Sequence, residues 1–480
     1  MGINPCFFVI NRECDVQKYR RLALVLGSSL VLSACANLSA GNLFSHYSAQ
    51  NSELHRSLQR GDYPSAEQAL PDAVAGEILD NFEKGRVYLL NQDYPASQQA
   101  FELSDQALRE QQDLATISVS QSAQSLSALA VNDNLSSYQP ADYELGFLHL
   151  YLGLNYVKQN DLEGALVEMR RANQVQEQAR KAREKELLSA QAQMQQQGLT
   201  PNLGSVLSHY PDAGTTLQAV QNGYLLYLSA LLYETEGELN SAYVDYRRAL
   251  AVMPQNDQVI DGTKRVAKRL AMNDDLRQLE ARYGQAKYLD RQRSRVIVID
   301  ERGVVDALQG WKQALPLSDS RGNGAWYSMA LPYYPKKRQI DQYSSVQLNQ
   351  QPLAASQLTD VNLMAQRDLS ERMPSLIIRQ ALRVWAKDQL RRQAAKDDDV
   401  ANLLFNVWNT LTEQPDTRSW LSLPADVYSA SLEVDPGEQV LIVNEQPYRF
   451  RVEQGNTVLV WLSRQGNNVI IWHKQLGNIR

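Results

Sequence analysis

The side chains best suited to chemistry are few and scattered along this chain. There are three Cys and five His, and no two His stand three or four residues apart, as a metal-binding pair on one helix face would. The sequence holds no P-loop and no G-x-S-x-G, H-E-x-x-H or C-x-x-C motif. His149 falls in the large-residue slot of a predicted helix, where a packed side chain is expected. We therefore expect no metal, no cofactor and no catalytic residue, although paired carboxylates cannot be located from sequence.

Cys35 carries the clearest chemical signature. It follows a basic cluster at 18–21 and an apolar run of 11 residues at 22–32, which is the order of a secretory signal peptide. The run is too short to span a membrane, which takes about 20 residues. Leu32-Ser33-Ala34-Cys35 resembles a bacterial lipobox, which implies cleavage before Cys35 and acylation of its sulfur. The alternative is an ordinary buried Cys after an apolar helix.

The residues around this motif refine the prediction. Ala36 follows Cys35 where inner-membrane lipoproteins of enterobacteria-like sorting tend to have Asp, so we expect a lipid anchor on the periplasmic face of the outer membrane. Cys6 and Cys14 lie upstream of the basic cluster, an unusually long leader, so Val16 is an alternative translation start. Cleavage would leave Cys35 as the single Cys of the mature chain, and no disulfide is expected.

One group of polar residues on a predicted helix is a candidate for binding a partner. Glu168 and Arg171 share a helix face, Arg170 points elsewhere, and Asn173 follows one turn after Arg170. Charges on such a face can bind a carboxylate or a backbone. The alternative, an exposed helix held by weak salt bridges, is favoured for these residues by the small energy of such pairs.

Two further polar groups lie at predicted element boundaries. Tyr143 and Glu144 stand in a first helical turn, where a carboxylate stabilises the helix dipole, and they are candidate partner-binding residues or a helix cap. Asp416, Arg418 and Trp420 stand where helix gives way to sheet. A Trp beside a charge pair is expected to fix a domain junction there rather than to bind a ligand.

The first half of the chain, residues 56–283, is predicted to be helical and repetitive. A looser copy of the pattern starts at Gly85 and a half copy at Gly61, whereas residues 173–196 extend one helix with mostly polar residues. The two clearest copies share small and large residues at equal offsets: Gly153, Tyr156, Ala165, Met169 and Ala172, then Ala230, Tyr233, Ala242, Tyr246 and Ala249. This spacing resembles the tetratricopeptide repeat, which implies pairs of antiparallel helices that cross at the small residues. The resemblance also implies an inner helix face that serves as a peptide groove.

The second half is predicted to mix strands and helices. A buried strand at 295–299 leads into a turn at 300–303. Further expected elements are strands at 325–331 and 344–348, a helix over about 358–395 split by Pro374, a helix at 398–412, and six short strands from Trp420 to Trp472 with a hairpin turn at 436–438. The strands near the C-terminus favour a small antiparallel β-sandwich-like module.

These elements predict a multidomain α + β protein. The expected ranges are a signal peptide at 1–34, a lipidated tether at 35–55, a helical repeat domain at 56–283, a mixed strand and helix domain at 295–415, and an antiparallel β module at 416–480. The lipobox, the run 151–173 and the run 416–424, in this order, resemble a broad family of Gram-negative outer-membrane lipoproteins with tetratricopeptide-like repeats. The resemblance brings no catalytic residues. Members of this family are often encoded beside lipoproteins that activate penicillin-binding proteins. The resemblance therefore also hints at a role in peptidoglycan assembly.

Composition narrows the function classes. Of 480 residues, 44% are hydrophobic and 21% charged, an ordinary globular balance, and the formal net charge of -6 argues against nucleic acid as a partner. We expect a non-enzymatic scaffold that binds envelope proteins, including peptidoglycan synthesis factors, through its repeats. The alternatives are a glycan-acting hydrolase with paired carboxylates in 295–480, and an accessory lipoprotein of surface-polymer export or secretion.

Overall fold

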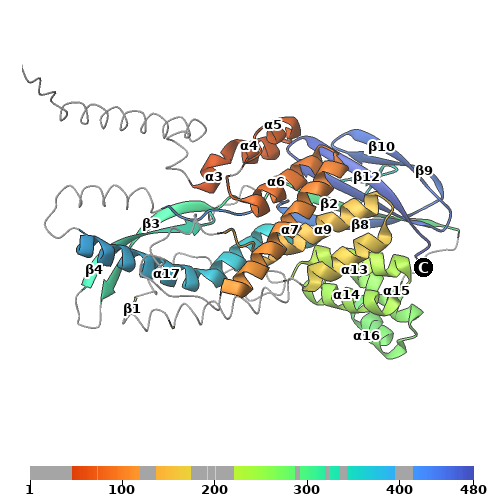
Figure 1. Cartoon of the computed structure of the whole chain (residues 1–480). Helices are drawn as coiled ribbons and strands as arrows, with labels where there is room; N and C mark the ends of the chain where they lie inside the picture. Colours follow the sequence, from red (N-terminus) through yellow and green to blue (C-terminus); the bar gives the residue numbers. More distant parts are fainter. Residues whose placement is uncertain are drawn as a thin grey trace, which may run out of the picture. The chain divides into compact units, whose positions relative to one another are not determined.

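The computed structural model describes residues 46–72, 74–118, 137–174, 192, 200–201, 221–286, 292–318, 324–335, 343–394 and 414–479. Helices come first along the chain and most strands follow, which confirms the prediction of a mixed helical and sheet protein (Figure 1). Cys35 with its lipobox, most of the polar extension 173–196, and the predicted helix 398–412 lie outside the described residues.

The helices of the first half form antiparallel pairs. After the short helix α3 (Tyr47–Gln50), the pairs are α4 (Ser52–Arg60) with α5 (Tyr63–Gln68), α6 (Glu77–Leu90) with α7 (Tyr94–Ser118), α9 (Asp142–Lys158) with the helix 162–174, α13 (Gly223–Glu236) with α14 (Leu239–Val252), and α15 (Asp257–Arg269) with α16 (Asn273–Tyr283). The half copy at Gly61 is thus a complete pair, and α15 with α16 is a pair whose repeat was not recognised in the sequence.

All five pairs turn in the same way. One residue between the two helices adopts the left-handed conformation, and the next N–H bonds to the carbonyl five residues earlier, which satisfies the end of the first helix. The left-handed residues are Gly61, Gln92, Asn160, Gly237 and Ala271, with φ between 54° and 88°. In the first three pairs the following residue is Asp, whose carboxylate accepts an N–H of the second helix and caps it.

The spacing of small and large residues is a packing rule within a pair. A Cβ atom on Gly85 would lie 2.5 Å from the ring of Phe101, sixteen residues later, and one on Gly153 would clash with the Met169 side chain at the same offset. The small residue therefore lets the large one enter the helix crossing. These contacts are those that the tetratricopeptide resemblance implies.

The strands form three open sheets. The largest has the order β12-β11-β2-β8-β7, and β2 runs parallel to β11. Its strands are β2 (Ser294–Arg302), β7 (Ser356–Asp360), β8 (Asp426–Val434), β11 (Thr457–Gln465) and β12 (Asn468–Gly477). A four-stranded sheet joins β10 (Gln446–Val452), β9 (Gly437–Val443), β5 (Gln347–Leu348) and β6 (Gln351–Pro352), and a third joins β1 (Thr200–Pro201), β3 (Gln309–Ser318) and β4 (Gly324–Tyr333).

The five-stranded sheet is buried on both faces. Along β2, Ile297 and Ile299 belong to the apolar cluster of the helices, whereas Val296 and Val298 pack with residues of the four-stranded sheet. Burial on both sides explains why β2 and β11 read as continuous apolar runs. An antiparallel sandwich confined to 416–480 is not confirmed, because β2 and β7 come from before residue 416.

Several local predictions are wrong for identifiable reasons. Residues 300–302 continue β2 instead of turning, because they pair with both β8 and β11. The turn at 436–438 joins strands of two different sheets, so it is not a hairpin. Helix α17 (Val361–Ala394) runs through Pro374, with buried Met373 and Ile377 packed on either side of the proline.

Candidate functional site

The carboxylate of Glu301 ties the helix pairs to the sheet. This fully buried β2 side chain accepts hydrogen bonds from Arg86 Nη2 on α6 at 2.6 Å and from the Tyr224 hydroxyl on α13 at 3.2 Å. Trp461 Nε1 on β11 donates at 3.1 Å, and the Tyr151 hydroxyl on α9 donates at 3.4 Å. Burial lowers the pKa of Arg86, but the charge of Glu301, its hydrogen bond and the nearby Tyr151 and Tyr63 together raise that pKa above its ordinary value. Glu301 is therefore a buried contact that three helix pairs share.

The loop before β8, which includes residues 420–422, packs against the first helices of the pairs in the way that a bound peptide would. Glu83 on α6 accepts the backbone N–H groups of Leu421 at 2.6 Å and Ser422 at 3.1 Å, and Arg86 Nε donates to the Ser422 carbonyl at 3.3 Å. The strand predicted at 420–423 is wrong because these backbone groups bind helix side chains instead of a neighbouring strand. Burial raises the pKa of Glu83 to about 8, against the lowering effect of these donors.

Tyr143 and Glu144 take part in the same buried contact. Glu144 Oε1 accepts the backbone N–H of Trp420 at 2.7 Å, and Oε2 accepts the N–H of Ala141 at 2.8 Å and the Tyr138 hydroxyl. Tyr143 is buried beside it, with its hydroxyl 3.4 Å from Glu144 Oε1. Burial raises the pKa of Glu144. Glu144 thus binds this chain's own loop, and both side chains are buried.

Three of the four candidate residues of helix 162–174, Arg170, Arg171 and Asn173, contact neighbouring repeats. Arg171 Nη2 donates to both carboxylate oxygens of Asp105 on α7, at 2.7 and 2.6 Å, and its Nη1 donates to Glu168 at 3.0 Å. Their other contacts reach the next pair: Arg170 with Glu238 at 2.8 Å, and Asn173 with Arg248 at 3.2 Å. Glu168 also lies 2.7 Å from Nδ1 of the buried His149, so that histidine is hydrogen-bonded. Partner binding by these residues remains a prediction.

Asp416, Arg418 and Trp420 lie where the loop meets the helices. Arg418 Nη2 bonds Asp416 at 2.7 Å, and its guanidinium stands 5.7 Å from the Tyr138 ring centroid. Trp420 is fully buried and stacks on Phe82 of α6 with ring centroids 4.4 Å apart. The contacts of Arg418 with Tyr138 and of Trp420 with Phe82 join residues far apart in sequence.

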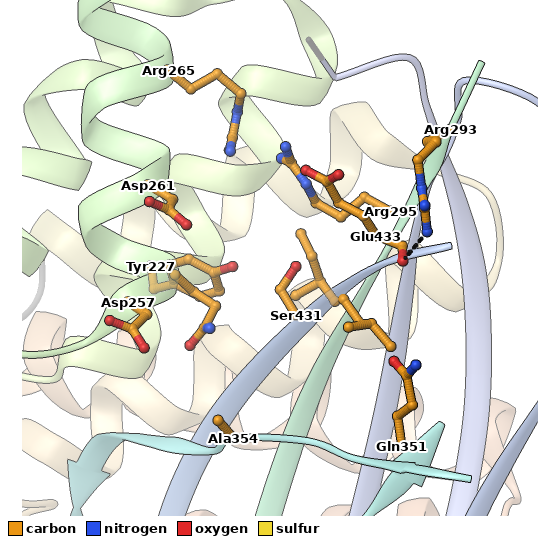
Figure 2. A pocket seen from close by; sticks show the side chains of 13 residues that line it. Tyr227, Asp257, Asp261, Arg265, Arg293, Arg295, Gln351, Ala354, Ser431 and Glu433 are labelled. Carbon is orange, nitrogen blue, oxygen red and sulfur yellow. Dashed lines mark hydrogen bonds between the residues drawn. The ribbon is translucent and has the colours of Figure 1, made fainter. Parts of the chain in front are cut away.

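A charged cavity of about 500 Å³ opens beside this core, between α13 and α15 on one side and β2 and β8 on the other. Figure 2 shows Asp257 and Asp261 of α15 across the cavity from Arg295 and Glu433 of the sheet. Tyr227 of α13 points its hydroxyl into the space between them (Figure 2). Such a volume lies within the range of small-ligand sites, and the polar lining distinguishes it from a packing defect.

The arginines of the cavity are satisfied to different degrees. Arg265 donates from Nε and Nη2 to the two carboxylate oxygens of Glu234, both at 2.7 Å. Arg293 Nη2 donates to the Glu433 carbonyl at 2.8 Å, as the dashed line in Figure 2 marks. Arg295 is 9% exposed, and its buried Nη1 has no hydrogen-bond partner within the described residues. Burial and the nearby charge of Arg265 lower the pKa of Arg295 to about 10.

Sequence reasoning missed Glu83, Arg86, Arg295 and Glu301. The side chains of a strand point alternately to its two faces, so residues 295, 297, 299 and 301 of β2 share one face. This geometry was a usable signal for Arg295 and Glu301. The described residues hold no group of three or more potential metal ligands among His, Cys, Asp and Glu. In this part of the chain no helix combines the length and the apolarity needed to cross a membrane.

Comparisons with known proteins complete the description. No protein-family model matches the chain, and no curated protein matches it either. Two solved structures of tetratricopeptide-repeat proteins are similar to it. "MamA MSR-1 C2" shares 12% identity over 48% of this chain and 95% of its own, with a TM-score of 0.25. The TPR2AB domain of yeast Sti1, in its pHSP90 complex, shares 9% identity over 49% of this chain and 91% of its own, with a TM-score of 0.19. At these TM-scores neither likeness carries an argument about function.

Proposed function

We propose that this chain is a non-enzymatic scaffold, anchored by a lipid on Cys35 to the periplasmic face of the outer membrane. It binds partner proteins of cell-envelope assembly through its helical repeats, with peptidoglycan synthesis factors as the favoured class. The observation that supports the repeats as a binding layer is their joint attachment to one sheet through Glu301, which holds three pairs in one rigid arrangement.

The second helices offer the surface for such a partner. The first helices α6, α9 and α13 face the sheet and its preceding loop, so their inner face is occupied. On the second helices, Val167 and Val244 occupy the same repeat position, 77 residues apart, and are 43% and 57% exposed. Arg170 and Arg171 link these helices to their neighbours, which makes the surface continuous.

Fractionation tests the anchor. Replacing Cys35 by Ala should remove lipidation, leave the precursor uncleaved and deplete the protein from the outer membrane. A Cys35→Ala protein that is still cleaved and still fractionates with the outer membrane at wild-type levels would refute the lipid anchor.

Direct binding tests the scaffold. The wild-type chain should capture envelope proteins, and the captured protein, purified, should bind it in solution. Val167→Asp and Val244→Asp should weaken that binding, while Arg449→Asp, at an exposed position of β10, should not. The same preparation should release no soluble fragments from peptidoglycan sacculi. Release of muropeptides, with no protein bound in solution, would favour the glycan-hydrolase alternative.

A further inference from the structure

We infer that the cavity between α15 and β2 binds a short peptide with a free C-terminal carboxylate, held by the Arg295 guanidinium. This ligand site goes beyond the proposed scaffold role and does not depend on it. It is built from residues of the helices α13 and α15 and the strands β2, β6 and β8, which lie far apart in sequence.

The unpaired guanidinium of Arg295 points to an anionic ligand. On the same face of β2, Glu301 receives four donors, whereas Arg295 has no ion-pair partner within the described residues. Glu433 stands directly opposite Arg295 on β8, yet no ion pair joins them. A buried cation without a partner destabilises the fold, and such a cost is typical of a binding site rather than of a structural one.

The other side chains of the cavity restrict what that anion can be. The lining holds three acidic residues, Asp257, Asp261 and Glu433, beside Arg293 and Arg295, while Arg265 is already bound by Glu234. This balance of charge favours a singly charged anion over a phosphate. Arg295 is the least exposed of the charged residues that line the cavity, and Asp257 is exposed in the first turn of α15. A ligand with one carboxylate and a cationic group a few atoms away complements both the positive charge of Arg295 and the negative charges of the acidic residues.

The chemistry and size together favour a peptide. A guanidinium binds a carboxylate through two parallel hydrogen bonds, and the Tyr227 hydroxyl lines the same cavity as a further donor. The ammonium group of the ligand would then face Asp257 and Asp261. The volume of about 500 Å³ exceeds the need of one small amino acid and suits a short peptide.

Calorimetric titration of the full-length chain, purified in detergent, tests the site with tri-alanine as the probe. Free tri-alanine should bind at millimolar concentration, its C-terminal amide should bind at least tenfold more weakly, and the N-acetyl form should also lose affinity. Inorganic phosphate should not displace it. Equal binding of the amide, displacement by phosphate, or no binding of tri-alanine at all would overturn the proposal.

Variants separate the site from the fold. Arg295→Met keeps the length and the apolar stem of the side chain, so the protein should stay folded while tri-alanine affinity falls at least tenfold. Arg451→Met, on β10 and outside the cavity, is the matched control and should bind as the wild type does. Unchanged affinity in a folded Arg295→Met protein would refute the assignment. Partner capture through Val167 and Val244 would be unaffected by that result.

Discussion

Replacing Glu301 by Gln should destabilise the protein more than any surface charge change. The substitution keeps the shape of the side chain but removes the charge that faces Arg86, whose side chain is fully buried. Arg86 would keep its bonds to the Ser422 carbonyl and the Ser463 hydroxyl, at 3.3 and 3.0 Å, but would lose its counter-ion.

The expected magnitude follows from the burial of both groups. Removing one member of a buried ion pair costs about 3–5 kcal/mol, because the remaining charge is left desolvated. The hydroxyl groups of Tyr151 and Tyr224 would then donate to a neutral amide oxygen, which is a weaker acceptor than a carboxylate. This weakening contributes less, about 1 kcal/mol at most for each hydrogen bond. We therefore expect Glu301→Gln to lower the free energy of unfolding by about 3–5 kcal/mol.

A double-mutant cycle identifies the cause. Arg86→Met with Glu301→Gln should recover part of the loss, because no charge then remains buried without a partner. Glu238→Gln, which breaks the exposed pair with Arg170, is the control and should cost less than about 1 kcal/mol. The measurement is equilibrium urea unfolding followed by tryptophan fluorescence. A loss below about 1 kcal/mol for Glu301→Gln, or strict additivity in the double variant, would refute the reasoning.

Three further changes test other contacts in the same urea assay. Gly85→Ala should cost about 1–3 kcal/mol although Ala is the better helix former, because the new methyl group meets the Phe101 ring; a gain would contradict the packing rule. Burial raises the pKa of Glu83 to about 8, so the folded state keeps a proton that the unfolded state releases, and stability should fall as the pH rises from about 5 to 8. If a Glu83→Gln protein shows the same decrease of stability with pH, a group other than Glu83 causes that decrease. Burial and Arg265 lower the pKa of Arg295 to about 10, so Arg295→Met should stabilise the fold by about 1–3 kcal/mol, and a destabilised variant would mean that the cation is satisfied.

The helix pairs could be predicted because their determinants are local. The small and large residues of one crossing, such as Gly85 and Phe101, stand sixteen residues apart, and each turn residue is adjacent to the cap that follows it. The copy at 257–283 escaped recognition because its turn uses Ala271, which is rare in the left-handed conformation and gives no compositional signal.

The sheet could not be predicted in the same way because its pairing is distant. Strand β2 pairs with β11 in parallel across more than 150 residues, and apolar runs carry no information on which strands become neighbours. Glu301 was assigned to a turn because Asp, Glu, Arg and Gly in succession are typical of one. The partner that makes a buried carboxylate tolerable there, Arg86, stands 215 residues earlier.

The occupied inner face decides where a partner can bind. The tetratricopeptide resemblance implies a peptide groove on an inner helix face. In this chain the side chains of Glu83 and Glu144, on the first helices, accept the backbone N–H groups of the chain's own residues Leu421, Ser422 and Trp420. Trp420 fills the adjoining apolar space against Phe82. A partner peptide would have to displace a fully buried Trp and three hydrogen bonds to two carboxylates. Within the described residues these contacts therefore fold the chain on itself, and the binding surfaces that we propose are the second helices and the Arg295 cavity instead.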